Sequence, residues 1–134
     1  MSNTRTAHGS FSVEMKPQGD PLAHEGVTLG RLTLHKRFEG DLEATGEGQM
    51  LTALSAVQGS AGYVAIERVT GTLHGRGGSF VFQHTGTMDQ GAQLLSVVVV
   101  PDSGTGELAG LRGSFRLRIE GGRHLYDFDY SLPG

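Results

Sequence analysis

The chain has 134 residues, a formal net charge of −3, 22 glycines and no cysteine. This length predicts one domain with a core of its own, and the lack of cysteine excludes disulfides and thiolate metal sites. Basic residues are scattered among acidic ones, which excludes a basic stripe for nucleic acid, and no apolar run could span a bilayer. With no apparent leader, we expect a cytoplasmic protein without nucleic-acid or membrane partners. We expect a loose tail at residues 1–5 and a single barrel domain over residues 6–134.

Alternation of apolar and polar residues predicts strands throughout, and no segment has a helical period. In chain order the expected strands lie at residues 6–16, 28–38, 42–53, 62–74, 79–89, 92–100, 113–120 and 125–132. Sequential hairpins of this kind are typical of an up-and-down barrel or a sandwich. Closure removes both sheet edges, so we predict an all-β, eight-stranded antiparallel up-and-down barrel. Such a barrel is filled by side chains or holds one small ligand.

The stretch from Gly62 to Asp89 predicts the central hairpin, with a glycine-rich turn at residues 75–78. A turn centred between Arg76 and Gly77 pairs Val69 with His84, and it pairs Glu67 with Gly86. Glu67 and His84 then point inward, on the apolar face of the hairpin. A slip of one residue would scramble that face, so the apolar pattern favours this placement.

Two further hairpins, with turns at residues 39–41 and 121–124, are predicted in the same way. A three-residue turn at residues 39–41 places Lys36 opposite Ala44, on the inner face. A turn at residues 121–124 places Arg118 opposite Asp127 on the outer face. The same register pairs Arg116 with Asp129, and the two opposite-charge pairs support it.

The hairpin around residues 89–91 predicts an assembly surface. A three-residue turn there points Ser96 inward, and the outward side chains beside it form an apolar strip. The strip consists of Val81, Leu95, Val97 and Val99. Exposed apolar patches usually mark contact surfaces, so we expect a homo-oligomer, most simply a twofold dimer. The alternative is a turn that differs by one residue. It would place Leu95, Val97 and Val99 in the core and Ser96 on the outer face.

Long segments of the chain resemble the bacterial DUF3224 family. They are KRFEGDLEATGEGQML, GYVAIERVTGTLHGRGGSFVFQHTGTMD, VVVVPDSGTGELAGLRGSF and HLYDFDYSL. Members of that family are similar in fold to the allene oxide cyclase barrel. The loop Gly104–Leu108 with Gly113 also resembles the GTG-containing loop of allene oxide cyclases and plant dirigent proteins. Those proteins use an apolar barrel cavity without a cofactor, so the resemblance implies a cofactor-free barrel. No residue match carries their catalytic groups onto this chain.

Three inward polar residues, Lys36, Glu67 and His84, are the candidate site. Buried charges are costly unless they are paired or face a cavity. In the structural interpretation Lys36 and Glu67 form an ion pair, while His84 bonds to Tyr63, Tyr126 or backbone. In the functional interpretation Glu67 is a general base and His84 a proton donor or orienter at the polar end of a pocket. The ligand-binding residues of that pocket would be Lys36, Tyr63, Phe82, Tyr126 and Tyr130.

Other chemistries have little support. Among the possible metal ligands, only His84 and Glu67 are expected inside the barrel, and two ligands are too few for a zinc site. The Gly104-x-Gly106 pattern is not followed by the helix that a dinucleotide fingerprint requires. Three hypotheses therefore stand: a barrel that binds a small apolar molecule, a cofactor-free isomerase or cyclase, and a packed structural barrel. We expect no metal and no cofactor in any of them.

Overall fold

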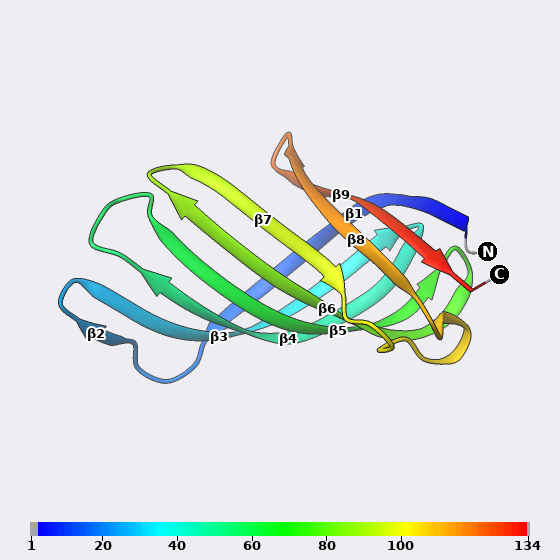
Figure 1. Cartoon of the computed structure of the whole chain (residues 1–134), viewed down its shortest axis with the longest axis horizontal. Helices are drawn as coiled ribbons and strands as arrows, with labels where there is room; N and C mark the ends of the chain where they lie inside the picture. The colour runs from blue at the N-terminus through cyan, green and yellow to red at the C-terminus, as the bar shows by residue number, and fades with distance from the viewer. Residues whose placement is uncertain (1–2, 134) are drawn as a thin grey trace.

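The computed structural model describes residues 3–133, which form nine strands and one 3₁₀ turn (Figure 1). The elements are β1 (Asn3–Pro17), β2 (Leu22–His24), β3 (Val27–Gly40), β4 (Leu42–Leu54), β5 (Ala61–Leu73), β6 (Arg76–Asp89), β7 (Ala92–Val99), η1 (Gly106–Leu108), β8 (Arg112–Glu120) and β9 (Arg123–Leu132). All strand pairs are antiparallel, in the order β1-β9-β8-β7-β6-β5-β4-β3-β2, and β1 also pairs with β3. That pairing closes an eight-stranded barrel, so the predicted all-β up-and-down barrel is confirmed. In residues 3–133 no helix has the length and apolar character needed to cross a membrane.

The first strand begins earlier than the one expected at residues 6–16. Strand β1 begins at Asn3, within the stretch expected as a tail (residues 1–5), and residues 1–2 lie outside the described part. Residues 17–26, expected as a loop, contain the short strand β2, which pairs with the start of β3. The two-residue turn between them, Glu25–Gly26, has φ values of 48° and 82°. Both residues are left-handed, as favoured hairpin turns require.

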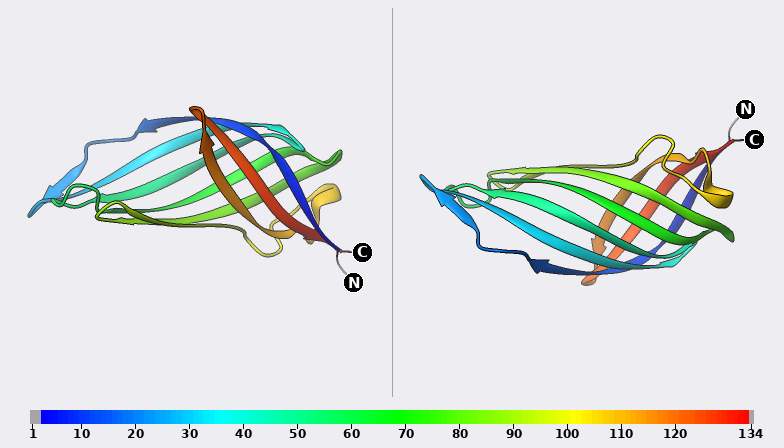
Figure 2. Two further views of the ribbon diagram at one scale, coloured as in Figure 1. Left: turned by 90° about the horizontal axis from the view of Figure 1, so that it is seen from above. Right: turned by 90° about the horizontal axis from the view of Figure 1, so that it is seen from below.

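The packed core occupies one end of the barrel. Its apolar cluster is rich in aromatic rings, which include Phe11, Phe38, Phe80, Phe82, Phe115, Tyr126, Phe128 and Tyr130. Leu108 of η1 and Leu111 are fully buried against this cluster. Figures 1 and 2 place η1 at the same end of the barrel as the two termini. The buried apolar cluster therefore lies at the end of the barrel near η1.

The opposite end is open because β7 and β8 barely pair. Only Val98 and Ser114 form a ladder pair between these strands in the described chain, and Figure 1 shows the strands diverging from that point. Leu117 and Ile119 follow the inward alternation of β8, but both are exposed, Ile119 to 67%. Strand β7, which would cover them in a fully paired barrel, diverges from β8 at this end. We call the gap between β7 and β8 the seam.

The central hairpin keeps its predicted faces but not its predicted register. Its turn is His74–Gly75, with φ values of 47° and 81°, and Leu73 pairs with Arg76. His84 therefore lies opposite Ala65, four positions from the predicted pairing. Because side chains alternate with a period of two, this even shift leaves Glu67 and His84 inward.

The register of the β6–β7 hairpin differs from the predicted register by one residue, an odd shift. Its turn is Gln90–Gly91, with φ values of 48° and 91°, and Phe82 pairs with Val99. Each side chain of β7 therefore changes face relative to the three-residue turn. Val97 is only 4% exposed and Val99 is also buried, whereas Ser96 faces out. The predicted exterior strip is wrong at these two valines, and the alternative that placed them in the core is confirmed.

The other two hairpins are shifted by two residues. Lys36 pairs with Gly46 instead of Ala44. In the last hairpin, Arg118 Nε lies 2.8 Å from Asp127 Oδ2, although the two residues are diagonal and not opposite. The second predicted pair is also present and also diagonal, between Arg116 Nη2 and Asp129 Oδ2 at 2.9 Å. Hydrogen bonds from Arg118 and His8 lower the pKa of Asp127.

Candidate functional site

Three charged or polar side chains meet inside the barrel: Lys36 of β3, Glu67 of β5 and His84 of β6. We call them the polar cluster. Glu67 Oε1 accepts a hydrogen bond from Lys36 Nζ at 3.2 Å and one from His84 Nε2 at 2.9 Å. The Glu67 side chain is 0% exposed and that of Lys36 10%. Lys36 balances the buried charge of Glu67, as a buried carboxylate requires.

The alternation of neighbouring strands brings the cluster together. Gly48 and Phe82 flank Glu67 in the sheet, and His84 is the next inward residue after Phe82. His84 is therefore diagonal to Glu67, which is the relation the sequence predicts. The predicted Lys36–Glu67 ion pair is present. His84 bonds to Glu67 rather than to the predicted tyrosines or backbone.

Aromatic rings hold the lysine end of the cluster. Lys36 Nζ lies 5.2 Å from the ring centroid of Phe11 and 5.9 Å from that of Phe38. Both distances are within the range of cation–π attraction, which is stronger where water is excluded. The ammonium group is thus stabilised by one carboxylate and two rings.

The second carboxylate oxygen of Glu67 is the one buried side-chain oxygen or nitrogen without a hydrogen-bond partner in residues 3–133. It faces Gly46 on the neighbouring strand β4. A Cβ atom added at Gly46 would overlap Oε2 and would lie 3.2 Å from the Phe38 ring. Gly46 therefore provides the space in which the carboxylate sits, a close approach that only glycine allows.

Tyr63 joins the polar cluster to the open end. Its ring lies against Gly86, where an added Cβ would overlap Cε1, and the ring centroid is 6.4 Å from that of His84. Burial raises the pKa of Tyr63, and the negative charge of Glu67 raises it further. The phenol is therefore a neutral hydrogen-bonding group between the cluster and the open end.

The open end contains a depression of about 360 Å³, which we call the cup. Its lining is mostly apolar and comes from β4 to β8, mainly from their inner faces, with Leu94 of the outward alternation at its edge. The lining residues include Met50, Leu54, Tyr63, Met88, Leu95 and Leu117. Thr52 and Gln93 supply two of the few polar groups. The cup exists because β7 and β8 diverge beside Leu95 and Leu117.

The predicted ligand-binding residues divide between the two ends. Phe82 packs edge-on against His84 with centroids 6.2 Å apart, but it is buried in the core. Tyr126 and Tyr130 lie at the packed end, outside the cup, so the prediction that they bind a ligand there does not fit their placement. The hydroxyl of Tyr126 donates to Glu39 O and accepts from Leu42 N, and burial raises its pKa to about 12. The hydroxyl of Tyr130 forms a hydrogen bond with His74 Nδ1.

The sequence prediction missed most of the cup. The sequence pattern singles out Tyr63 as a pocket residue, but it points Leu95 outward, and it does not single out Met50 or Leu54. The Gln90–Gly91 turn points Leu95 inward; it ends in glycine, but its first residue is not one of those favoured in two-residue hairpin turns, so the sequence carries only half of the usual signal. The inward alternation of β4 passes through Met50 and Leu54.

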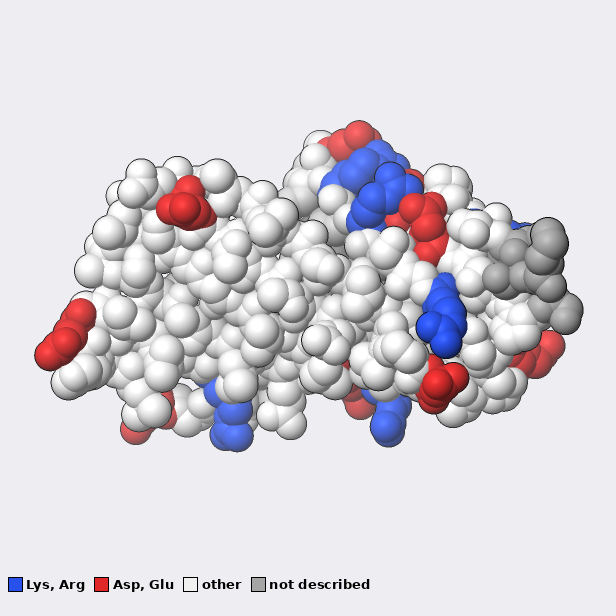
Figure 3. Space-filling view, in the orientation of Figure 1, with Lys and Arg blue, Asp and Glu red and all other residues white. Residues whose placement is uncertain are grey.

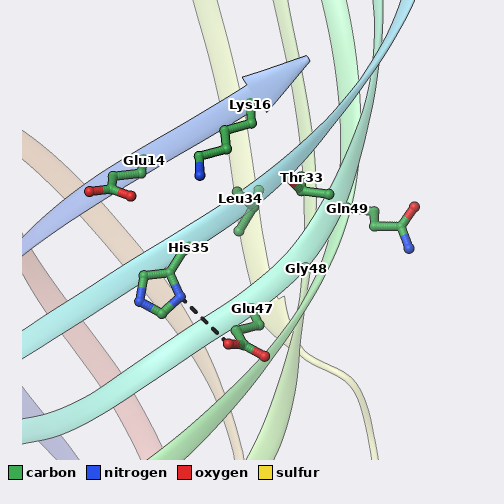
Figure 4. A pocket seen from close by; sticks show the side chains of 8 residues that line it. All are labelled: Glu14, Lys16, Thr33, Leu34, His35, Glu47, Gly48 and Gln49. Carbon is green, nitrogen blue, oxygen red and sulfur yellow. Dashed lines mark ion pairs between the residues drawn. The ribbon is translucent and has the colours of Figure 1, made fainter. Parts of the chain in front are cut away.

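A second depression lies over β1, β3 and β4 (Figure 4). His35 and Glu47 approach within 3.6 Å across it, and the Glu47 side chain is 79% exposed. Such exposed pairs contribute little, because water solvates both partners. Within residues 3–133 no group of three or more His, Asp or Glu side chains could hold a metal ion. The cup and the polar cluster therefore form the better candidate site.

Comparison with known proteins identifies one family and one solved structure that are similar to this chain. The model of the family described as "Protein of unknown function (DUF3224)" matches residues 7–130. One solved structure is a protein of unknown function from the DUF3224 family of Shewanella oneidensis MR-1. It is 47% identical, with a TM-score of 0.94, and the alignment covers 98% of this chain and 99% of that one. No curated protein matches the chain.

Proposed function

The chain belongs to the DUF3224 family, and from its geometry we propose that it binds one small apolar or amphipathic molecule in the cup. The observation that carries the proposal is an apolar depression on the inner face of the barrel, bordered by a neutral phenol. Ligand pockets are concave and mainly apolar, with a few polar groups that orient the ligand. Their volumes start at about 300 Å³, so a cup of about 360 Å³ suits a small ligand.

The apolar body of the ligand would contact Leu95, Leu117 and the two methionines of the cup. Methionine side chains are flexible and adapt to ligands of different shape. A hydroxyl, carbonyl or similar group of the ligand would bond to Tyr63 at the inner end. This orientation keeps the polar group of the ligand beside Tyr63, between the cup and the polar cluster.

A second candidate function is a cofactor-free isomerase or cyclase. The 2.9 Å bond from His84 to Glu67 favours it, because a carboxylate that orients an imidazole is a common acid–base arrangement. Tyr63 would then transfer a proton between the ligand and His84. Against it stands the complete burial of Glu67, which separates the carboxylate from the cup. A ligand recovered chemically unchanged after incubation supports binding, and recovery of an isomer supports catalysis.

The binding proposal is tested with N-phenyl-1-naphthylamine, an uncharged apolar probe that fluoresces on leaving water. We expect saturable binding, and we expect Leu117→Gln to weaken it about tenfold or more, since burial of a leucine is worth about 1.5–3 kcal/mol. Ile119→Gln is the matched control. Ile119 lies two residues further along β8 with the same alternation, but it is not part of the cup lining. Equal weakening by both variants, or no saturable binding by the wild type, contradicts the proposal.

A further inference from the structure

One edge of β7 has no strand beside it over residues 92–96. These residues pair with β6 on one side, but the ladder to β8 within the described chain is confined to Val98 and Ser114. The backbone groups of residues 92–96 that point into the seam therefore lack a neighbouring strand. An edge of this kind is a template for pairing with another chain.

This edge lacks the usual protection. Proteins discourage edge pairing with charged side chains, proline or bulges. Strand β7 has the sequence AQLLSVVV, with no charge and no proline. The opposite edge of the seam, β8, contains Arg116, Arg118 and Glu120. Figure 3 shows basic and acidic side chains gathered in that region, while the surface over β6 and β7 is almost free of charge. The two edges therefore differ, and only β7 is suited to pairing.

Apolar side chains are exposed along the same strand. Leu94 is 75% exposed, the largest value among the exposed large hydrophobic residues of the described chain. Val98 on the outer face of β7 and Ile66 on the outer face of β5 are also exposed, with Gln83 between them in the sheet. Leu94 and Val98 thus expose apolar surface along β7 itself, and exposed apolar surface is a feature of contact sites.

We propose that β7 pairs antiparallel with β7 of a second copy of this chain, about a twofold axis that crosses residues 92–96. A twofold interface places each residue near the axis against its own copy, so a charged strand would meet like charge. A strand without charge avoids that repulsion, which matters for a protein of net charge −3. The strand of the second copy would also cover the side of the cup that the seam leaves open. The proposed contact is an edge of β7 and not the strip expected from the sequence, since Val97 and Val99 are buried.

Sedimentation equilibrium tests the proposal. The wild type should have twice the chain mass of 14.2 kDa. Leu94→Lys should weaken the dimer about a hundredfold, because two like charges then meet across the axis at a cost of several kcal/mol. Leu29→Lys is the control, as Leu29 is an exposed apolar residue on β3. A monomeric wild type at the highest soluble concentration overturns the proposal, and so does a Leu94→Lys variant that stays dimeric.

Disulfide trapping provides an independent readout. The chain has no cysteine, so any covalent dimer must form through an introduced one. Single cysteines are placed in turn at residues 92–96 and, as a control, at Thr45 on β4. A residue near the axis meets its own copy at the separation that a disulfide requires. We expect an oxidised dimer from at least one of the five positions and none from Thr45→Cys. Absence of crosslinking at all five positions overturns the proposed pairing.

Discussion

Glu67→Gln is expected to lower the free energy of unfolding by about 3–5 kcal/mol, the usual effect of breaking a buried ion pair. The substitution removes the carboxylate charge but leaves Lys36 in the barrel, where its Nζ loses its ionic partner at 3.2 Å. Urea denaturation followed by circular dichroism measures the change. Glu47→Gln is the matched control on the barrel exterior. Glu47 is 79% exposed at its side chain, so its loss should change stability by less than about 0.5 kcal/mol.

A double variant separates the ion pair from simple packing. Replacing Lys36 by Met and Glu67 by Leu removes both charges together, and such replacements of buried pairs are often neutral or stabilising. We expect the double variant to be more stable than Glu67→Gln alone. If Glu67→Gln is as stable as the wild type, the polar cluster is not a buried pair that stabilises the barrel.

Gly46→Ala is expected to lower the free energy of unfolding by about 1–3 kcal/mol, the usual cost of overpacking a core. The added methyl group would overlap Glu67 Oε2. The carboxylate cannot turn away without lengthening its bonds to Lys36 or His84. Phe38 lies 3.2 Å from the new carbon on the other side. The strand must therefore shift, and urea denaturation measures the cost.

Gly77→Ala is the control for this effect. Gly77 also lies in a strand, but the nearest atom to an added Cβ is Glu107 Oε1, at 3.9 Å. Replacing such a glycine reduces the entropy of the unfolded chain, so the variant should equal or exceed the wild type in stability. Equal losses for Gly46→Ala and Gly77→Ala would show that backbone strain, not the carboxylate, dominates.

The sequence predicts faces better than registers. Alternation with a period of two identifies Lys36, Glu67 and His84 as inward, and each of them is buried. Registers depend on the turns, and three hairpin turns contain a non-glycine residue with positive φ, namely Glu25, His74 and Gln90. Few non-glycine residues adopt that conformation, so composition alone does not indicate it. At three hairpins the observed register differs from the predicted one by two or four residues, so each side chain keeps its predicted face. At Gln90–Gly91 the register differs by one residue, so the side chains of β7 lie on the faces opposite to those predicted.

The cup could not be predicted from any single strand. It requires β7 and β8 to diverge after Val98 and Ser114, and this depends on how the whole barrel closes. Leu117 follows the inward alternation of β8, yet it is exposed because β7 diverges from β8 beside it. The polar cluster, in contrast, depends on local alternation in three strands, so the sequence identifies its members.

Methyl NMR of the methionines tests the central proposal most directly. The chain has four methionines, of which Met50 and Met88 line the cup while Met15 lies outside it. On titration with N-phenyl-1-naphthylamine we expect saturable shifts of the Met50 and Met88 methyl resonances, because the aromatic rings of the probe lie against them. The Met15 resonance should stay in place. Saturable probe binding that leaves the Met50 and Met88 resonances unmoved would show that the ligand binds elsewhere and would contradict the proposed cup.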